Sequence, residues 1–231
     1  MGAPASRPST LNGDLSARVV VDSEMLPWTA SPSGTVWRRR LHLVGATEAG
    51  QVTSVVRFEE RSQFHLHDHP EGEEILVLEG VFSDEFGDWP AGSYLLNPEG
   101  FRHAPFSREG CLLFVKLRQF PGRDRAHVAV RTDAVPWQPN GGCAVKLLYS
   151  QRGFADTTRL ERWSPGAVPR DRAYPQGAEL FVLGGSFADE DGVYGRHTWL
   201  RFPKGSGHAP RTTQGCELYV KEGGLGYLRS G

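Results

Sequence analysis

The chain has 231 residues, of which 39% are hydrophobic and 23% are charged, a composition typical of one large globular domain or of two with about 100 residues each. The formal net charge of −1 excludes the strong basic field expected of a protein that binds nucleic acid or an anionic membrane surface. No apolar run approaches the roughly 18 residues of a membrane span, and three cysteines are too few for a disulfide framework, so we expect a cytoplasmic protein.

The chain begins with a segment of low complexity and continues as short apolar segments. Residues 1–18 are rich in Ser, Pro, Ala and Gly and lack the apolar stretch of a signal peptide, so we expect a disordered leader. The later apolar segments have strand character and are separated by turns that contain many of the 28 glycines and 16 prolines. This pattern predicts an all-β fold of the sandwich or barrel type. The predicted strands include residues 36–44, 51–58, 75–82, 93–96 and 111–117.

A histidine-rich segment in the first half carries the strongest functional signal. His65, His67 and His69 stand at alternate positions, so they share one face of an extended strand. Glu73 joins that face if the strand stays regular, and His103 supplies another imidazole from a later segment. The set His67, His69, Glu73 and His103 has the nitrogen and oxygen donors that a divalent transition metal needs.

The spacing of these residues resembles the two sequence motifs of the cupins. His67-x-His69, three residues, Glu73, six residues and Gly80 fit the first motif. Gly92, five residues, Pro98-x-Gly100, two residues and His103 fit the second. Segment 72–85 and the residues around Cys111 resemble the ChrR-type cupin, the module found at the C-terminus of the anti-sigma factor ChrR. The chain departs from the pattern at Ser107, where an Asn is common. The resemblance implies a jelly-roll barrel, also called a double-stranded β-helix, with a metal held by the four residues named above.

The second half of the chain repeats the first. Residues 53–116 align with residues 158–221 at a constant offset of 105, and 23 of the 64 aligned positions are identical. A self-similar period of this length indicates a duplicated domain. We therefore predict two tandem barrels: an N-terminal cupin at 19–122 and a C-terminal cupin at 123–231.

The repeat predicts that only the front barrel binds metal. His67, His69 and Glu73 correspond to Arg172, Tyr174 and Ala178, whereas His103 keeps its type as His208. One imidazole cannot hold an ion, so we expect no metal in the second barrel. Its three polar residues, Arg172, Tyr174 and His208, predict either an anion site or a satisfied polar network.

Other residues are assigned by their place in the predicted strands. Glu74 is matched by Glu179 in the second half, which favours a structural role over metal ligation. Four side chains are predicted to orient the metal ligands or to line the pocket of the first barrel: His65, Tyr94, Phe101 and Phe114.

The ligand set allows two classes of function. A six-coordinate Fe(II), Mn(II) or Ni(II) ion would leave two positions open, whereas a tetrahedral Zn(II) ion would be closed by four protein ligands. Relatives of the ChrR-type cupin include acetylacetone-cleaving dioxygenases, so the resemblance implies oxidative cleavage of a small diketone or hydroxyketone. The alternative without turnover is a zinc-binding, ChrR-like ligand or redox sensor, or else a storage-like or metal-handling bicupin. Either class has a small-molecule partner, and both a monomer and a homodimer remain open.

Overall fold

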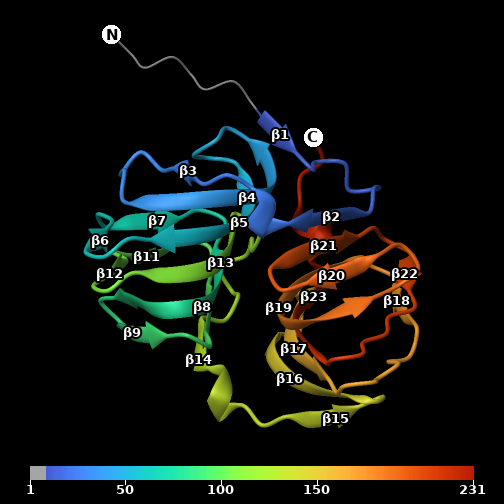
Figure 1. Cartoon of the computed structure of the whole chain (residues 1–231). Helices are drawn as coiled ribbons and strands as arrows, with labels where there is room; N and C mark the ends of the chain where they lie inside the picture. Colours follow the sequence, from blue (N-terminus) through green and yellow to red (C-terminus); the bar gives the residue numbers. More distant parts are fainter. Residues whose placement is uncertain (1–8) are drawn as a thin grey trace.

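The computed structural model describes residues 9–231, which form two β barrels side by side (Figure 1). The expected leader lies partly outside the described residues, at 1–8. Its remainder is structured, so the expectation of disorder is wrong for residues 9–18. Two side chains fix this segment: the Asn12 amide donates to the Leu41 carbonyl at 2.7 Å, and Arg18 forms an ion pair with Asp189.

The first barrel consists of an antiparallel sheet and a small separate two-stranded ribbon. The central strand order is β1-β4-β5-β13-β8-β10-β14. The strands of this sheet are β1 (Ser9–Leu11), β3 (Thr29–Ala30), β4 (Val36–Gly45), β5 (Gln51–Phe58), β6 (Ser62–Gln63), β8 (Glu73–Asp84), β9 (Gly87–Pro90), β10 (Ser93–Asn97), β12 (Phe106–Ser107), β13 (Cys111–Leu117) and β14 (Val128–Arg131). The ribbon pairs β7 (His67–His69) with β11 (Phe101–His103).

The second barrel repeats this plan, as expected from the internal repeat. Its strand order is β15-β16-β17-β23-β19-β21-β2, and β18 and β22 form the corresponding ribbon. The strands are β2 (Val19–Asp22), β15 (Gln138–Asn140), β16 (Cys143–Ser150), β17 (Thr157–Trp163), β18 (Arg172–Tyr174), β19 (Ala178–Ala188), β20 (Val193–Gly195), β21 (Thr198–Phe202), β22 (Ser206–His208) and β23 (Cys216–Glu222). Three short 3-10 helices complete the described chain, at Ser23–Met25, Thr132–Ala134 and Gly224–Tyr227. The all-β, two-barrel prediction is confirmed.

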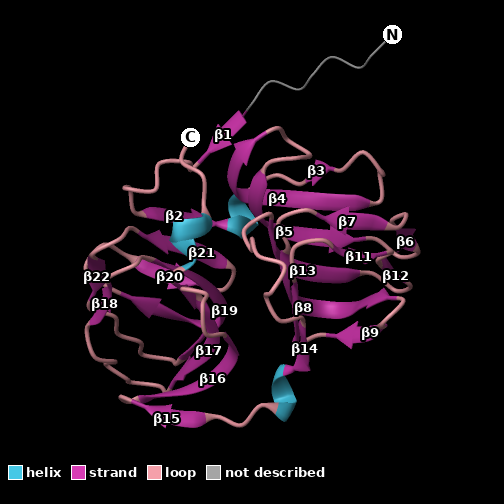
Figure 2. Cartoon of the chain, turned by 180° about the vertical axis from the view of Figure 1, so that it is seen from behind, coloured by secondary structure: helices cyan, strands magenta, loops and turns pink. Residues whose placement is uncertain are grey.

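Each half of the chain gives one strand to the other barrel. β2 comes from the front half but pairs with β21 of the second barrel, with Val19 opposite Arg201. β14 comes from the rear half but pairs with β10 of the first barrel, with Ser93 opposite Arg131. The crossing of β2 to the second barrel is visible from both sides of the molecule (Figures 1 and 2). The boundary between the two halves of the sequence therefore does not coincide with the boundary between the two barrels.

The alternation of side chains along the strands builds two separate cores. Along β8, Ile75 faces the interior of the first barrel, whereas Leu76 faces the second barrel. The core between the barrels contains Leu41, Val55, Leu76, Tyr94, Leu96, Phe114, Leu148, Tyr149, Leu160, Phe181, Trp199 and Tyr219. The rings of Phe114 and Phe181 stack across this contact with centroids 4.4 Å apart. The two barrels thus share one continuous apolar contact.

Buried charges cross the same contact in a reciprocal pattern. Lys116 of the first barrel binds Glu179 of the second at 2.6 Å, and Lys221 of the second lies 3.4 Å from Glu74 of the first. These residues correspond at the offset of 105, so the pairs are related by an approximate two-fold axis. Glu74 has a structural role, as expected. It also accepts hydrogen bonds from the hydroxyl groups of Tyr94, Thr158 and Tyr219.

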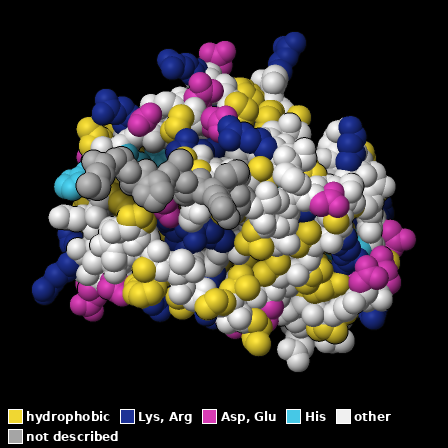
Figure 3. All heavy atoms as spheres, turned by 90° about the horizontal axis from the view of Figure 1, so that it is seen from above, with side chains coloured by type: hydrophobic (Ala, Val, Ile, Leu, Met, Phe, Trp, Pro, Cys, Tyr) yellow, Lys and Arg dark blue, Asp and Glu magenta, His cyan; other side chains and the backbone are white. Residues whose placement is uncertain are grey.

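The face seen from above carries basic and acidic side chains that are interspersed (Figure 3). Among residues 9–231, no helix is long and apolar enough to cross a membrane.

Candidate metal centre

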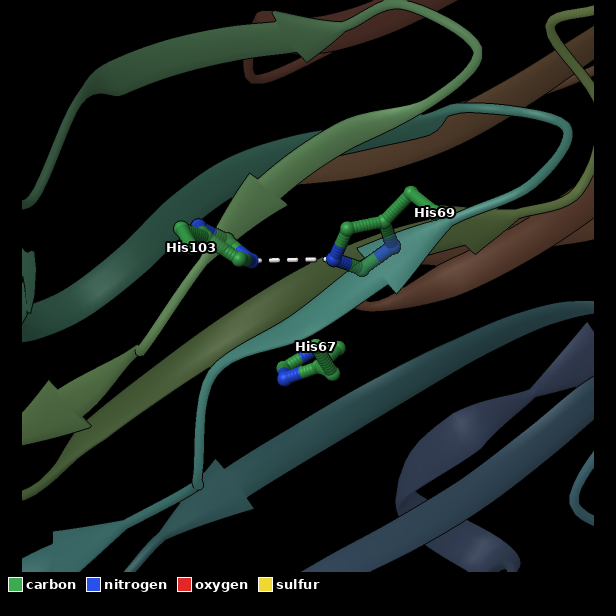
Figure 4. A group of neighbouring side chains, drawn as sticks. All are labelled: His67, His69 and His103. Carbon is green, nitrogen blue, oxygen red and sulfur yellow. Dashed lines mark hydrogen bonds between the residues drawn. The ribbon is translucent and has the colours of Figure 1, made fainter.

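Three histidines converge at the mouth of the first barrel. His67 and His69 lie on β7, and the antiparallel pairing of β7 with β11 sets His103 directly opposite His67. One ligand nitrogen from each of the three side chains lies within 4.8 Å of the others. The rings come from two adjacent strands and point toward one another (Figure 4). Within residues 9–231 this is the one group of three or more potential metal-ligating side chains at such spacing.

Glu73, at the start of β8, lies beside the three histidines. Its Oε2 lies 3.5 Å from Nε2 of both His69 and His103, and it accepts a 3.0 Å hydrogen bond from the Asn97 amide. The carboxylate arrives through a turn, not along a regular strand as assumed from the sequence, because Gly72 N donates to His69 O. Gly72 has a φ of +70°, and a Cβ there would lie 2.7 Å from Cβ of Phe120. Only glycine makes this turn without strain.

The hydrogen bonds around the histidines assign the nitrogen that each presents. Nδ1 of His103 donates to Asp84 at 3.1 Å, and Nδ1 of His67 donates to the carbonyl of His65 at 2.8 Å. Their Nε2 atoms are therefore free of protons when the rings are neutral. Nε2 of His69 and Nε2 of His103 lie only 3.0 Å apart (Figure 4). At this distance either His69 Nε2–H donates a hydrogen bond to His103 Nε2, or a cation lies between two nitrogen lone pairs.

Burial and neighbouring charges shift the pKa values of two of the histidines in opposite directions, so that His69 favours the neutral form and His103 the protonated form. Burial lowers the pKa of His69, and the charge of Glu73 offsets this only in part. Burial also acts to lower the pKa of His103, but the hydrogen bond to Asp84 and the charges of Glu73, Asp84 and Glu85 together raise it. Three imidazoles and one carboxylate in a mostly buried cluster fit a divalent transition metal, whose charge replaces the shared proton.

A cavity of about 410 Å³ opens from this cluster into the barrel. His65, His67, His69 and Glu73 are among the residues that line it. The walls are mainly apolar side chains that face inward from β4, β5, β8 and β13, together with several charged groups, among them Arg38 and Arg40 of β4. The apolar wall residues are Val36, Val52, Val56, Phe58, Phe64, Ile75, Phe82, Leu113, Val115 and Leu117. A small organic molecule fits beside the ligand cluster.

The other predicted pocket residues are divided between two places. Phe101 packs against His103 with ring centroids 5.6 Å apart and stacks on His127, so it supports the cluster from outside the cavity. Tyr94 and Phe114 are fully buried between the barrels, so the prediction that they lie in the pocket is wrong. The strands that carry Tyr94 and Phe114 were predicted correctly. However, both faces of these strands are apolar, and the sequence does not distinguish the barrel interior from the contact with the second barrel.

The second barrel keeps the aspartate that contacts the remaining histidine, but other side chains replace the remaining candidate ligands. Nδ1 of His208 contacts Asp189 at 3.0 Å, as His103 contacts Asp84 in the first barrel. Nε2 of His208, however, is 3.2 Å from the Tyr174 hydroxyl. Arg172 binds Glu161 at 2.6 Å. Side chains of the barrel itself therefore satisfy the three polar residues that were predicted to form either an anion site or a closed network.

Two residues that orient the ligands were not predicted from the sequence, namely Asp84 and Asn97. Asp84 lies in segment 72–85, which carries the resemblance, and it falls within the internal repeat, but no role at the site was predicted for it. The available signal was its repetition as Asp189, 19 residues before a histidine in both halves. Asn97 is replaced by Phe202 in the second half, so its loss accompanies the loss of Glu73.

Comparison with known proteins agrees with the fold and the repeat. No curated protein matches the chain. A candidate dioxygenase from Nostoc punctiforme superposes with a TM-score of 0.74 at 16% identity, covering 94% of this chain and 87% of the other. Protein YlbA from E. coli superposes with a TM-score of 0.68 at 16% identity and 94% coverage of both chains. Oxalate decarboxylase from Lactobacillus farciminis, in its formate complex, has a TM-score of 0.65 at 12% identity, covering 88% of this chain and 85% of the other.

The family model described as the ChrR cupin-like domain matches the chain twice, at residues 16–121 and 125–226. The two matches cover nearly all of the described residues and fall on the two halves of the repeat. The chain therefore belongs to the ChrR cupin-like family and contains two copies of its domain.

Proposed function

We propose that the chain is a mononuclear non-haem metal enzyme that cleaves a small diketone or hydroxyketone with dioxygen. The observation that carries this proposal is the 410 Å³ cavity that opens directly onto His67, His69 and Glu73. A site that only held a structural ion would need no space for an organic ligand beside it. The superposition on a candidate dioxygenase from Nostoc punctiforme supports the same class.

In this proposal, His67, His69, Glu73 and His103 hold one divalent ion, with Fe(II) or Zn(II) preferred over Mn(II) and Ni(II). An ion held there supplies Lewis acidity and, in the case of iron, redox chemistry with dioxygen. The apolar walls exclude water from the ligand. The hydrogen bonds from Asn97 to Glu73 and from His103 to Asp84 keep the donors aimed at one point.

The second barrel holds no metal in this proposal and serves to complete the first. Tyr174 occupies the position of His69 and hydrogen-bonds the remaining histidine, His208. We also propose a cytoplasmic location, because Cys111, Cys143 and Cys216 are all unpaired.

Metal content and oxygen uptake test the assignment together. We expect natively purified protein to contain about one equivalent of metal per chain, and His103→Asn to lose most of it. His208→Asn is the matched control, because it removes the corresponding histidine of the second barrel and leaves the donor set intact. Fe(II)-loaded protein should consume oxygen with at least one member of a panel that includes acetylacetone. Elemental analysis and an oxygen electrode provide the two measurements.

Two results would contradict the proposal. Equal metal content in the His103→Asn and His208→Asn variants would place the ion elsewhere. Zinc in the native protein, together with no oxygen uptake across the panel, would support the sensor class implied by ChrR.

A further inference from the structure

Two arginines and one glutamate form an ion bridge on the wall of the metal-site cavity. Arg38 and Arg40 stand two residues apart on β4, on the face that points into the barrel, and both line the cavity. Glu48, from the turn between β4 and β5, binds both: Oε2 contacts Arg38 at 2.5 Å and Oε1 contacts Arg40 at 3.0 Å. A single carboxylate therefore spans two guanidinium groups, the geometry by which arginines recognise carboxylates.

The carboxylate in this bridge is the most accessible of the three groups. The side chain of Glu48 is 43% exposed, whereas those of Arg38 and Arg40 are 19% and 12% exposed. Burial, followed by the charge of Arg38, lowers the pKa of Arg40, and Glu48 offsets this only in part. The two arginines are therefore held in the cavity wall, whereas the carboxylate that neutralises them belongs to Glu48, on a more exposed turn.

The charged side chains that line the cavity balance one another, so a divalent ion bound there would favour an additional anion. Its ionisable side chains, apart from histidine, are three arginines and three carboxylates: Arg38, Arg40, Arg118, Glu48, Asp68 and Glu73. Arg118 makes no ion pair within residues 9–231. A divalent ion at Glu73 would bring the lining to a net charge of +2, which one or two ligand carboxylates would neutralise.

We propose that the cavity binds a small keto acid, whose carboxylate replaces that of Glu48 between Arg38 and Arg40 while its keto group faces the three histidines. The Glu48 carboxylate competes with the carboxylate of the ligand for the two arginines, and it binds them when the cavity contains no ligand. The inference narrows the substrate class of the proposed function to those small diketones and hydroxyketones that also carry a carboxylate, which should bind more tightly than their neutral counterparts. The placement of the keto group rests on that function, whereas recognition of the carboxylate rests on the arginines alone.

The test compares an acid with its neutral ester. The probes are 2,4-dioxopentanoate and its methyl ester, titrated by anaerobic calorimetry into metal-loaded and into chelator-stripped protein. We expect the acid to bind at least about tenfold more tightly than the ester in both forms, the ratio typical of one charge-assisted contact. Arg40→Gln and, independently, Arg38→Gln should reduce this ratio to near one. Thermal melting of each variant establishes that it is folded.

Two further variants separate recognition from structure. Arg39→Gln is the matched control, because Arg39 lies on the outer face of the same strand, 4.2 Å from the Trp28 ring, and should keep the tenfold ratio. Glu48→Gln should tighten binding of the acid several-fold and leave the ester unchanged, because the competing charge is removed.

The outcomes distinguish this inference from the proposed function. Three results would overturn the inference: equal affinities for acid and ester, no binding of either probe, or weaker acid binding by Glu48→Gln. Each would show that the ion bridge between Glu48 and the two arginines only stabilises the fold. If the inference is correct and the metal assignment is wrong, the preference for the acid persists in both forms, although the His103→Asn and His208→Asn variants contain equal metal.

Discussion

Asp84 determines which nitrogen of His103 faces the other ligands. It accepts hydrogen bonds from His103 Nδ1 at 3.1 Å, from the Trp89 indole at 3.1 Å and from the Phe86 amide at 3.0 Å. Burial alone would raise the pKa of Asp84, but these donors together lower it, so the carboxylate stays ionised. An ionised Asp84 fixes the tautomer and the ring plane of His103, and it increases the basicity of Nε2.

Removing Asp84 should therefore weaken the metal site without removing a ligand. We expect Asp84→Ala to reduce metal affinity by roughly 10–100-fold, the usual effect of losing such a partner. Asp88→Ala is the control, since Asp88 is exposed and interacts only with Ser83 and Arg108. Competition with a chromophoric chelator measures both affinities. Identical values for the two variants would show that His103 is oriented by packing alone.

The strands of the first barrel serve two purposes, one on each face. On β8, Glu73 points to the metal site, and Glu74, the next residue, points to the second barrel. On β13, Val115 lines the cavity and Lys116 binds Glu179. Adjacent residues of one strand thus belong to different sites, because successive side chains alternate between faces.

This alternation explains what the sequence could and could not predict. The convergence of His67, His69 and His103 could be predicted, because these residues follow a regular spacing along the chain. Their role as metal ligands, together with Glu73, stays a prediction. The places of Tyr94 and Phe114 could not be predicted, because a strand buried on both faces carries no polar side to orient it. Nor does any local pattern encode the exchange of β2 and β14, whose partners are distant in sequence.

The exchange of β2 and β14 predicts that the front half alone forms a dimer. β2 and the following 3-10 helix in the front half correspond to β14 and its helix in the rear half. Residues 9–122 expressed alone should therefore pair with a second copy, each β2 docking on the β10 of its partner, with Glu74 facing Lys116. Light scattering after gel filtration measures the mass. Glu74→Lys should abolish the dimer by placing two lysines together, and a folded wild-type monomer would contradict the prediction.

At the scale of the whole molecule, a network of buried charges lies at the contact between the two halves. The Lys116–Glu179 pair crosses this contact, and Lys221 lies 3.4 Å from Glu74 across it. Within the rear half, Asp156 binds both Arg125 and Lys221 at 2.9 Å, with the Arg125 and Asp156 side chains fully buried. Burial acts to raise the pKa of Asp156, but the charges of Lys221 and Arg125 outweigh it and hold the pKa below the ordinary value of 3.8. An ionised Asp156 therefore stabilises the folded state.

Acid should destabilise the molecule through this group. Because the folded-state pKa of Asp156 is lowered, its contribution to the free energy of unfolding is complete above the unfolded-state pKa of 3.8 and is lost as pH falls through the folded-state value. Removing the charge at neutral pH leaves two buried cations, so Asp156→Asn should cost about 3–5 kcal/mol. The difference from wild type should narrow below pH 4.

Urea denaturation of chelator-stripped protein between pH 3 and 7 measures this profile without a contribution from metal release. Asp133→Asn is the control, because its ion pair with Arg131 is exposed, and its profile should follow that of wild type. A constant difference between wild type and Asp156→Asn across the range would show that the carboxylate is not the titrating group.

The reciprocal strands also set an order of events during synthesis. Val19 is synthesised long before its partner Arg201, and Ser93 must likewise wait for Arg131. The front barrel therefore emerges from the ribosome with an open sheet edge, and β2 remains without its partner strand until the rear barrel exists. Pairings so distant in sequence are slow to form and leave apolar surface exposed in the meantime. We therefore expect nascent chains of this protein to need protection of their unpaired strand edges until the rear barrel has folded.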